Sequence, residues 1–175
     1  VSKQFNCPLF NADKEVAEIY KYDRSCYLKI KKALPKYIIS DQLDKKFLLK
    51  AVLDSKNNLK KISKIVHPIV RTRMNKFLTK NRMKKLVVLD IPLYLENKLN
   101  KRGDVLIFVD AKRKDIQKRL KNRKYFSEKI HKKLKSLHLP LRKKRKLSNF
   151  VIKNTFNASK IQNDVKKIKT KILKI

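Results

Sequence analysis

The chain has 175 residues, of which 42% are hydrophobic and 36% charged, so it can bury the core of one folded domain and is not a wholly disordered protein. Its formal net charge of +35 suits contact with polyanions, but 39 lysines against 10 arginines, spread from Lys3 to Lys174, favour an origin in overall composition over a specific nucleic-acid site. No apolar run reaches the roughly 18 residues of a membrane span, and the N-terminal residues lack a signal-peptide pattern, so we expect a cytoplasmic protein.

The first half of the chain reads as one short strand followed by helices. In chain order, the apolar spacing predicts a strand at residues 8–10, a helix at 14–32, a helix after residue 44 and a long helix at 55–81. Asp13 stands where an N-cap is expected, and a break near Asp23 is compatible with the spacing. Pro68 lies inside the long helical pattern, so we expect it to kink or divide that helix.

The second half alternates between strands and helices. The pattern predicts strands at residues 86–89, 105–109 and 149–154, and helices at 111–123, 127–139 and 158–173. The first two strands are unbroken apolar runs, which are typical of strands covered on both faces. The expected fold is therefore an α/β fold with a parallel sheet and flanking helices.

Three aspartates fall at predicted strand ends, namely Asp13, Asp90 and Asp110. Ligands of open α/β sheets bind at the carboxyl ends of the strands, and an acid there can orient Mg²⁺ in a phosphoryl-transfer enzyme. An aspartate after a strand is, however, more often a turn residue or a helix cap. From the sequence alone, each of these aspartates can be either a metal-orienting acid or a turn or cap residue.

Basic and imidazole side chains give weaker signals. Arg119 and Arg123 are four residues apart on one predicted helix, so they share a face that could neutralise a polyphosphate or simply face solvent. His67 has no metal partner at a useful spacing and by itself is more often a packed histidine. His131 and His138 are seven residues apart on a predicted helix, where we expect no acidic or cysteine companion for either, and we interpret them as surface residues.

The order of these pieces resembles the dephospho-CoA kinase family from about Val1 to Leu173. The segments that carry the resemblance are FNADKEVAEIY, LDKKFLLKAVLDSKNNLKKISKIVHPIVR, VVLDIPLYLEN, DVLIFVDAKRKDIQKRLKNR and HLPLRKKRKLSNFVIKN. The resemblance implies a P-loop fold of the nucleoside-monophosphate-kinase type. It also implies that ATP, with Mg²⁺, phosphorylates the 3′-hydroxyl of dephospho-CoA in the last step of coenzyme A synthesis.

The resemblance assigns the acceptor side of the site. Asn11-Ala12-Asp13 matches the family's D-A-D, which makes Asp13 the catalytic base or orienter and Asn11 a substrate-binding amide in place of an acid. His67-Pro68 matches the H-P motif of the substrate subdomain, and Arg71 lies one helical turn further on. These three positions, Asn11, His67 and Arg71, are the expected contacts to dephospho-CoA.

The resemblance also assigns the donor side. Arg119 and Arg123 match the R-x-x-x-R at the start of the lid and are expected to contact ATP. Asp90 stands where P-loop enzymes commonly keep an acid that faces Mg²⁺ indirectly, and residues 92–96 match P-L-L-x-E. His138 replaces a glutamine and Ser148-Asn149 replaces A-D, and both changes touch the lid or adenine contacts rather than the chemistry.

A three-part organisation follows from the resemblance. A single kinase-like domain has its core at residues 1–22, 84–123 and 147–175, a helical substrate subdomain at about 23–83, and a lid at about 124–146. The family opens with a strand and a G-x-x-x-x-G-K-[ST] loop of roughly 15 residues in all that holds the ATP phosphates. Gly103 is the only glycine here, so no segment matches that loop, and we expect this chain by itself to have no kinase activity.

Two other functions remain as alternatives. The charge of +35 suits a basic nucleic-acid-binding protein on a P-loop-like fold, and a nucleoside monophosphate could replace dephospho-CoA as the acceptor. The H-P and P-L-Y-L-E segments argue against the second alternative. The sequence leaves the oligomeric state open.

Overall fold

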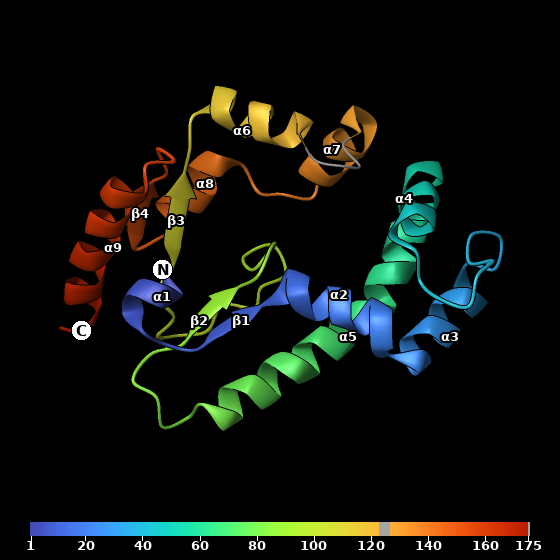
Figure 1. The fold of residues 1–175 in the computed structure, drawn as a ribbon, viewed down its shortest axis with the longest axis horizontal. Coiled ribbons are helices and arrows are strands. Elements are labelled where there is room, and N and C mark those ends of the chain that lie inside the picture. Colours follow the sequence, from blue (N-terminus) through green and yellow to red (C-terminus); the bar gives the residue numbers. More distant parts are fainter. Residues whose placement is uncertain (123–126, 175) are drawn as a thin grey trace. The chain divides into compact units, whose positions relative to one another are not determined.

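The computed structural model describes residues 1–122 and 127–174. Its elements, drawn in Figure 1, are α1 (Ser2–Phe5), β1 (Leu9–Asn11), α2 (Ala12–Tyr22), α3 (Arg24–Ala33), α4 (Lys45–Asp54), α5 (Lys56–Lys80), β2 (Val88–Asp90), β3 (Ile107–Asp110), α6 (Arg113–Lys121), α7 (Glu128–Lys135), α8 (Leu141–Lys146), β4 (Phe150–Lys153) and α9 (Ala158–Ile172). They divide into two compact units, one of Pro8–Pro92 and one of Val1–Cys7 with Leu93–Ile175. No helix in the described ranges is long and apolar enough to cross a membrane.

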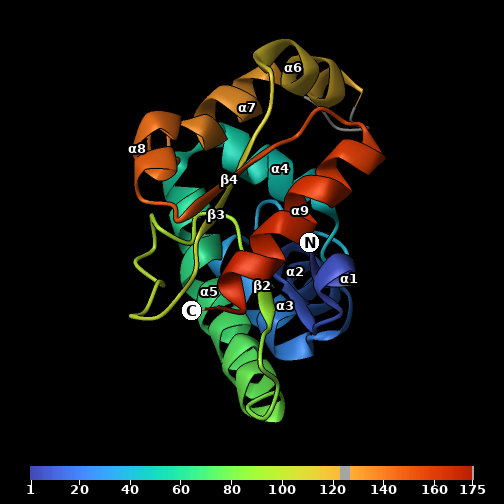
Figure 2. The same cartoon turned by 90° about the vertical axis from the view of Figure 1, so that its left-hand side faces the viewer.

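The unit Pro8–Pro92 is built around the long helix α5. Helices α2, α3 and α4 all pack against α5, as the views in Figures 1 and 2 both show. The buried side chains of this cluster are Ile19, Cys26, Tyr27, Ile30, Leu34, Ile38, Leu43, Leu48, Ala51, Val52, Ile62 and Val66. Because this apolar stripe recurs at helical spacing, the helices were predictable from the sequence, and their presence is confirmed.

The helix starts are set by local side-chain caps. Asn11 caps α2 by accepting a hydrogen bond from the Lys14 N–H, so the prediction of Asp13 as the cap is wrong, because β1 runs to Asn11 and the helix begins directly after it. Asp23 ends α2 and caps α3, which confirms the break at that residue. Asp44 caps α4 in the same way.

Pro68 does not divide α5, which runs unbroken through it. Of the two expected outcomes, the division into two helices is therefore wrong, whereas the kink stays a prediction. A proline removes one backbone hydrogen bond, whereas α5 buries Ile62, Val66 and Met74 along its length, and this packing holds the helix together. The Thr72 hydroxyl, one turn after Pro68, donates a hydrogen bond of 3.1 Å to the Pro68 carbonyl.

Strands β1 and β2 pair in parallel on the second half of α5. Their register places Leu9 opposite Val88 and Asn11 opposite Asp90. Phe10 is buried, with its ring centroid 5.6 Å from that of Phe77 on α5. Both strands therefore end side by side at the start of α2.

The second unit holds the other parallel pair, β3 and β4, with Asp110 opposite Lys153. Helix α9 packs on β4 (Figure 1) and buries Val165, Ile168 and Ile172, and Ile152 of β4 is also buried. Coverage is uneven, since Val109 of β3 remains 53% exposed. Helices α6, α7 and α8 occur between the two strands in the chain.

Candidate functional site

The carboxyl ends of β1 and β2 meet in a hydrogen bond between two side chains. Asn11 Nδ2 donates to Asp90 Oδ2 at 2.9 Å, and Asn11 Oδ1 accepts from the Lys14 N–H at 2.9 Å. Because both ends of the amide are occupied, its orientation is fixed. Asp90 is exposed, and its other oxygen, Oδ1, has no hydrogen-bond or ion-pair partner among the described residues.

Asp13 lies in the first turn of α2, two residues after Asn11. Its side chain is exposed and has no hydrogen-bond or ion-pair partner within the described part of the chain. The unpaired N–H groups at a helix start favour a negative charge at this position. An unpaired carboxylate at a strand edge can accept a proton from a bound hydroxyl.

Helix α2 is tied to α5 by an ion pair that sequence reasoning missed. Arg73 Nη1 lies 3.1 Å from Glu15 Oε2 and 3.6 Å from Glu18 Oε2. The available signal was the i, i+3 spacing of two glutamates in a chain with only 14 acids, but no local pattern identifies their cation. The contact fixes the helix whose first turn carries Asp13.

His67 is half-buried on α5, and Arg71 lies one helical turn after it at an exposed position. Burial lowers the pKa of His67 from 6.5, and the positive charge of Arg71 lowers it further, so the imidazole is neutral at pH 7. Within the described ranges no hydrogen bond or ion pair joins either residue to Asp13 or Asp90. They belong to the same compact unit as these acids.

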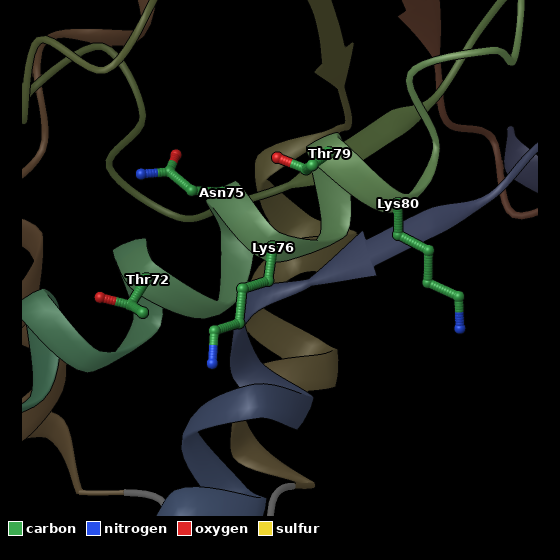
Figure 3. A pocket seen from close by; sticks show the side chains of 5 residues that line it. All are labelled: Thr72, Asn75, Lys76, Thr79 and Lys80. Atoms are coloured by element: carbon green, nitrogen blue, oxygen red, sulfur yellow. The ribbon is translucent and has the colours of Figure 1, made fainter.

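A hollow of about 480 Å³ follows the exposed side of α5 beyond Arg71. Its lining, shown in Figure 3, consists of Thr72, Asn75, Lys76, Thr79 and Lys80. The two lysine side chains extend in the same direction in that view. The sequence pattern gave no indication of this hollow, because exposed helical lysines occur throughout the chain.

The expected donor-side residues belong to the other unit. Arg119 lies on α6, and its Cζ is 4.1 Å from the centroid of the Phe156 ring. Arg123 lies outside the described residues. Asp110 ends β3, and its Oδ2 lies 3.6 Å from Arg145 Nη1 on α8.

Glu96 forms a buried ion pair in this second unit, with only 10% of its side chain exposed. Its Oε1 accepts hydrogen bonds from Lys144 Nζ at 2.6 Å and from the Leu139 N–H at 2.8 Å. Burial by itself would raise the pKa of Glu96, but these hydrogen bonds outweigh it and hold the pKa below 4.5. The motif that ends at Glu96 thus fixes the segment that enters α8.

His138 stands beside this pair, with its Nδ1 3.7 Å from Glu96 Oε1 and 3.2 Å from Lys144 Nζ. The expectation that His138 lacks an acidic companion is therefore wrong, because the partner is 42 positions away in the chain. Burial lowers the pKa of His138, and the charge of Lys144 lowers it further. The imidazole is then neutral at pH 7 and can accept a hydrogen bond from the Lys144 ammonium.

Asn149, which stands where the family motif has an aspartate, lies at the start of the β3–β4 pair. Its Oδ1 accepts a hydrogen bond of 2.8 Å from the Leu106 N–H, and its own N–H donates to the Leu106 carbonyl at 2.9 Å. An aspartate could accept the same bond, so the change to asparagine preserves the contact.

Comparison with known proteins supports one family. A family model described as dephospho-CoA kinase matches residues 1–160. Among curated relatives, the dephospho-CoA kinase of Wolbachia sp. subsp. Brugia malayi is 31% identical over 95% of this chain and 86% of its own length. The dephospho-CoA kinase of Bartonella quintana is 31% identical over 86% of this chain and 77% of its own length.

Solved structures show the same fold. A Thermus thermophilus protein superimposes with a TM-score of 0.76 at 23% identity, over 95% of this chain and 84% of that protein. The dephospho-CoA kinase from Campylobacter jejuni superimposes with a TM-score of 0.63 at 19% identity, over 98% of this chain and 87% of that protein. At these identities the likeness concerns the fold alone.

Proposed function

Because this chain belongs to the dephospho-CoA kinase family, we propose that it transfers the γ-phosphoryl group of ATP to the 3′-hydroxyl of dephospho-CoA, which completes coenzyme A. The observation that carries the proposal is the match of the family model to residues 1–160. The unpaired Asp13 carboxylate, next to the joined ends of β1 and β2, supports it.

On the acceptor side, Asp13 orients the 3′-hydroxyl and takes its proton as the phosphoryl group arrives. Its exposure and lack of a partner in the described ranges leave it available to a bound sugar. Arg71 and neutral His67 hold the rest of dephospho-CoA against the helical subdomain at about residues 23–83. Arg71 neutralises phosphate charge, and the imidazole offers one donor and one acceptor.

On the donor side, Arg119 and Arg123 neutralise the negative charge that ATP carries into the transition state. The lid at about residues 124–146 would close over the nucleotide. Gly103 is the only glycine of the sequence, so these 175 residues contain no segment that matches a glycine-rich phosphate-binding loop.

The acids at the strand ends fit an ion that arrives with the nucleotide. Mg²⁺ is usually held by one or two carboxylates together with substrate phosphates and water, and it neutralises phosphate charge when bound. Asp90 offers one such carboxylate with an open oxygen, while Asn11 fixes the other oxygen. No group of three potential metal ligands occurs among the described residues.

The test is a coupled kinase assay on two proteins. One is this chain, and the other is this chain with a strand and a G-x-x-x-x-G-K-[ST] loop fused ahead of Val1. We expect the fused protein to phosphorylate dephospho-CoA and the chain alone to remain inactive. Equal or faster turnover of AMP, CMP or UMP by the fused protein would instead favour a nucleoside-monophosphate kinase.

We also propose that the reaction takes place in the cytoplasm.

A further inference from the structure

The loop between β4 and α9 holds an aromatic residue in an unfavourable backbone conformation. Phe156 has φ 57, in the left-handed region that glycine adopts readily and a bulky side chain rarely does. Asn154 Oδ1 accepts a hydrogen bond of 3.0 Å from the Phe156 N–H, which holds the turn in this form. A phenylalanine in this strained backbone conformation suggests that its side chain has a function.

The Phe156 ring supports Arg119. The Arg119 Cζ lies 4.1 Å from the ring centroid, which is the separation of a guanidinium stacked on an aromatic face. No acid pairs with Arg119 within the described ranges, and its side chain is exposed. Its N–H donors and the outer side of its guanidinium therefore remain available to a ligand.

Simple packing does not account for the ring. The core of this unit is formed by residues such as Val165 and Ile152, which are almost fully buried, whereas Phe156 keeps 36% of its surface exposed. A glycine or asparagine would satisfy the backbone at position 156 with less strain. The ring contributes something that those residues lack, namely a flat face under the guanidinium.

We propose that Phe156 is a positioning residue that sets the base selectivity of the donor nucleotide, by holding Arg119 so that its guanidinium stacks on a nucleobase while its N–H groups meet phosphate. This inference rests on the proposed function, in which Arg119 contacts ATP. A planar guanidinium stacks on any base, and more strongly on the larger surface of a purine. A lysine or an unsupported arginine would contact phosphate without reading the base.

The test compares nucleotide binding with phosphate binding on the full chain. NMR titrations with ATP, CTP and tripolyphosphate give three dissociation constants. Because CTP shares the ribose and triphosphate of ATP, tighter binding of ATP than of CTP measures the selectivity for the base. The ratio of the tripolyphosphate constant to the ATP constant separates the contribution of the nucleoside from the general attraction of a basic protein. We expect Phe156→Leu, which keeps a bulky apolar side chain in the same backbone conformation, to reduce this ratio roughly tenfold. Phe156→Tyr retains the aromatic face and should keep the ratio of the unsubstituted chain.

Tyr22 supplies the matched control. It is also an exposed aromatic residue under a cation, with Lys21 Nζ 4.8 Å from its ring centroid, but it lies in the other unit. Tyr22→Leu should leave all three dissociation constants unchanged. An equal loss of ATP and tripolyphosphate affinity in Phe156→Leu would assign Phe156 a purely structural role and overturn the inference.

Two further outcomes are decisive. If the unsubstituted chain binds ATP no more tightly than tripolyphosphate, or does not bind ATP, the inference is wrong even where the fused protein phosphorylates dephospho-CoA. If the ratio falls in Phe156→Leu but the fused protein phosphorylates no dephospho-CoA, base stacking stands and the proposed function fails. The binding ratio and the kinase assay therefore separate the two proposals.

Discussion

The Asn11 side-chain amide donates a 2.9 Å hydrogen bond to the Asp90 carboxylate across the ends of two paired strands. In the motif that this segment resembles, an acid occupies the position of Asn11. Two carboxylates at this separation would repel each other, whereas the amide supplies a donor. Asparagine therefore suits a neighbour that is itself an aspartate.

Asn11→Asp tests this relationship without disturbing the start of α2. The new carboxylate can still cap the helix by accepting from the Lys14 N–H, but it loses the donor to Asp90 and adds a like charge. We expect the free energy of unfolding to fall by about 1–2 kcal/mol. Thermal unfolding followed by circular dichroism measures the change.

Two variants make the result specific. The double variant Asn11→Asp/Asp90→Asn restores one carboxylate and one amide, so it should recover most of the lost stability. Asn157 caps α9 through the Lys160 N–H, and Asn157→Asp should therefore leave stability unchanged or slightly raised. A loss in Asn157→Asp as large as in Asn11→Asp would contradict the argument.

Lys144→Met removes the cation of the buried pair in the second unit. Glu96 then stays nine-tenths buried without its cation, beside the Leu139 N–H and the His138 imidazole, and we expect a loss of about 2–3 kcal/mol in chemical denaturation. Glu128 and Lys132 form an exposed pair at 3.8 Å, so Glu128→Gln should cost no more than about 0.5 kcal/mol. Equal effects would show that burial of the Glu96 pair is unimportant.

The lowered pKa of Glu96 predicts an acid-dependent loss of stability. A carboxyl group whose pKa is lower in the folded state stabilises the protein fully above its unfolded value of 4.5, and this contribution disappears as the pH falls through the folded pKa. Glu96→Gln lacks the titrating group. The stability difference between the unsubstituted chain and Glu96→Gln should thus shrink below pH 4.5, as measured by unfolding at several pH values.

Asp13→Asn should affect turnover much more than stability. In the fused kinase described above, loss of the base should lower kcat by about 10²- to 10⁴-fold. The free energy of unfolding should fall by no more than about 0.3–1 kcal/mol, the contribution of an acid near a helix start, because the side chain is exposed and unpaired in the described structure. Asp23→Asn, at a helix cap that asparagine also serves, is the matched control and should retain kcat. An active Asp13→Asn enzyme would refute the assigned role.

The charge of +35 predicts salt-sensitive contact with DNA and no sequence preference. Filter binding of random duplexes should weaken by orders of magnitude between about 50 and 200 mM salt, because diffuse lysine contacts depend on counterion release. Binding that survives 200 mM salt and selects particular sequences would support the nucleic-acid alternative.

Local features of the fold were predictable from the sequence, and long-range ones were not. Apolar periodicity located α4, α5 and α9, and Asp23 marked the end of α2, because caps and helical spacing act within a few residues. Helix α8 was missed, since Leu141–Lys146 is almost wholly basic and has no apolar face to detect. Its position depends on Glu96, which is 48 residues from Lys144 in the chain.

The same distinction holds for the candidate site. Asn11, Asp13 and Asp90 could be assigned to one sheet edge because parallel strands end together, and the register of β1 and β2 confirms that Asn11 and Asp90 are neighbours. The contacts of Arg73 with α2 and of Arg119 with Phe156 could not be assigned. Side chains of this length reach partners that are set by tertiary packing, for which the sequence offers many equivalent lysines and arginines.

The contact between Asp110 and Arg145 joins the point where the chain leaves β3 to the point just before it enters β4. Because β3 and β4 are parallel, the chain that leaves β3 at Asp110 enters β4 at Phe150, which lies opposite Ile107 at the other end of the pair. The stretch between them also carries Leu139 and Lys144, whose groups bind the Glu96 carboxylate. A connection grafted from a homologous kinase would therefore have to retain a cation and a backbone donor at these two positions.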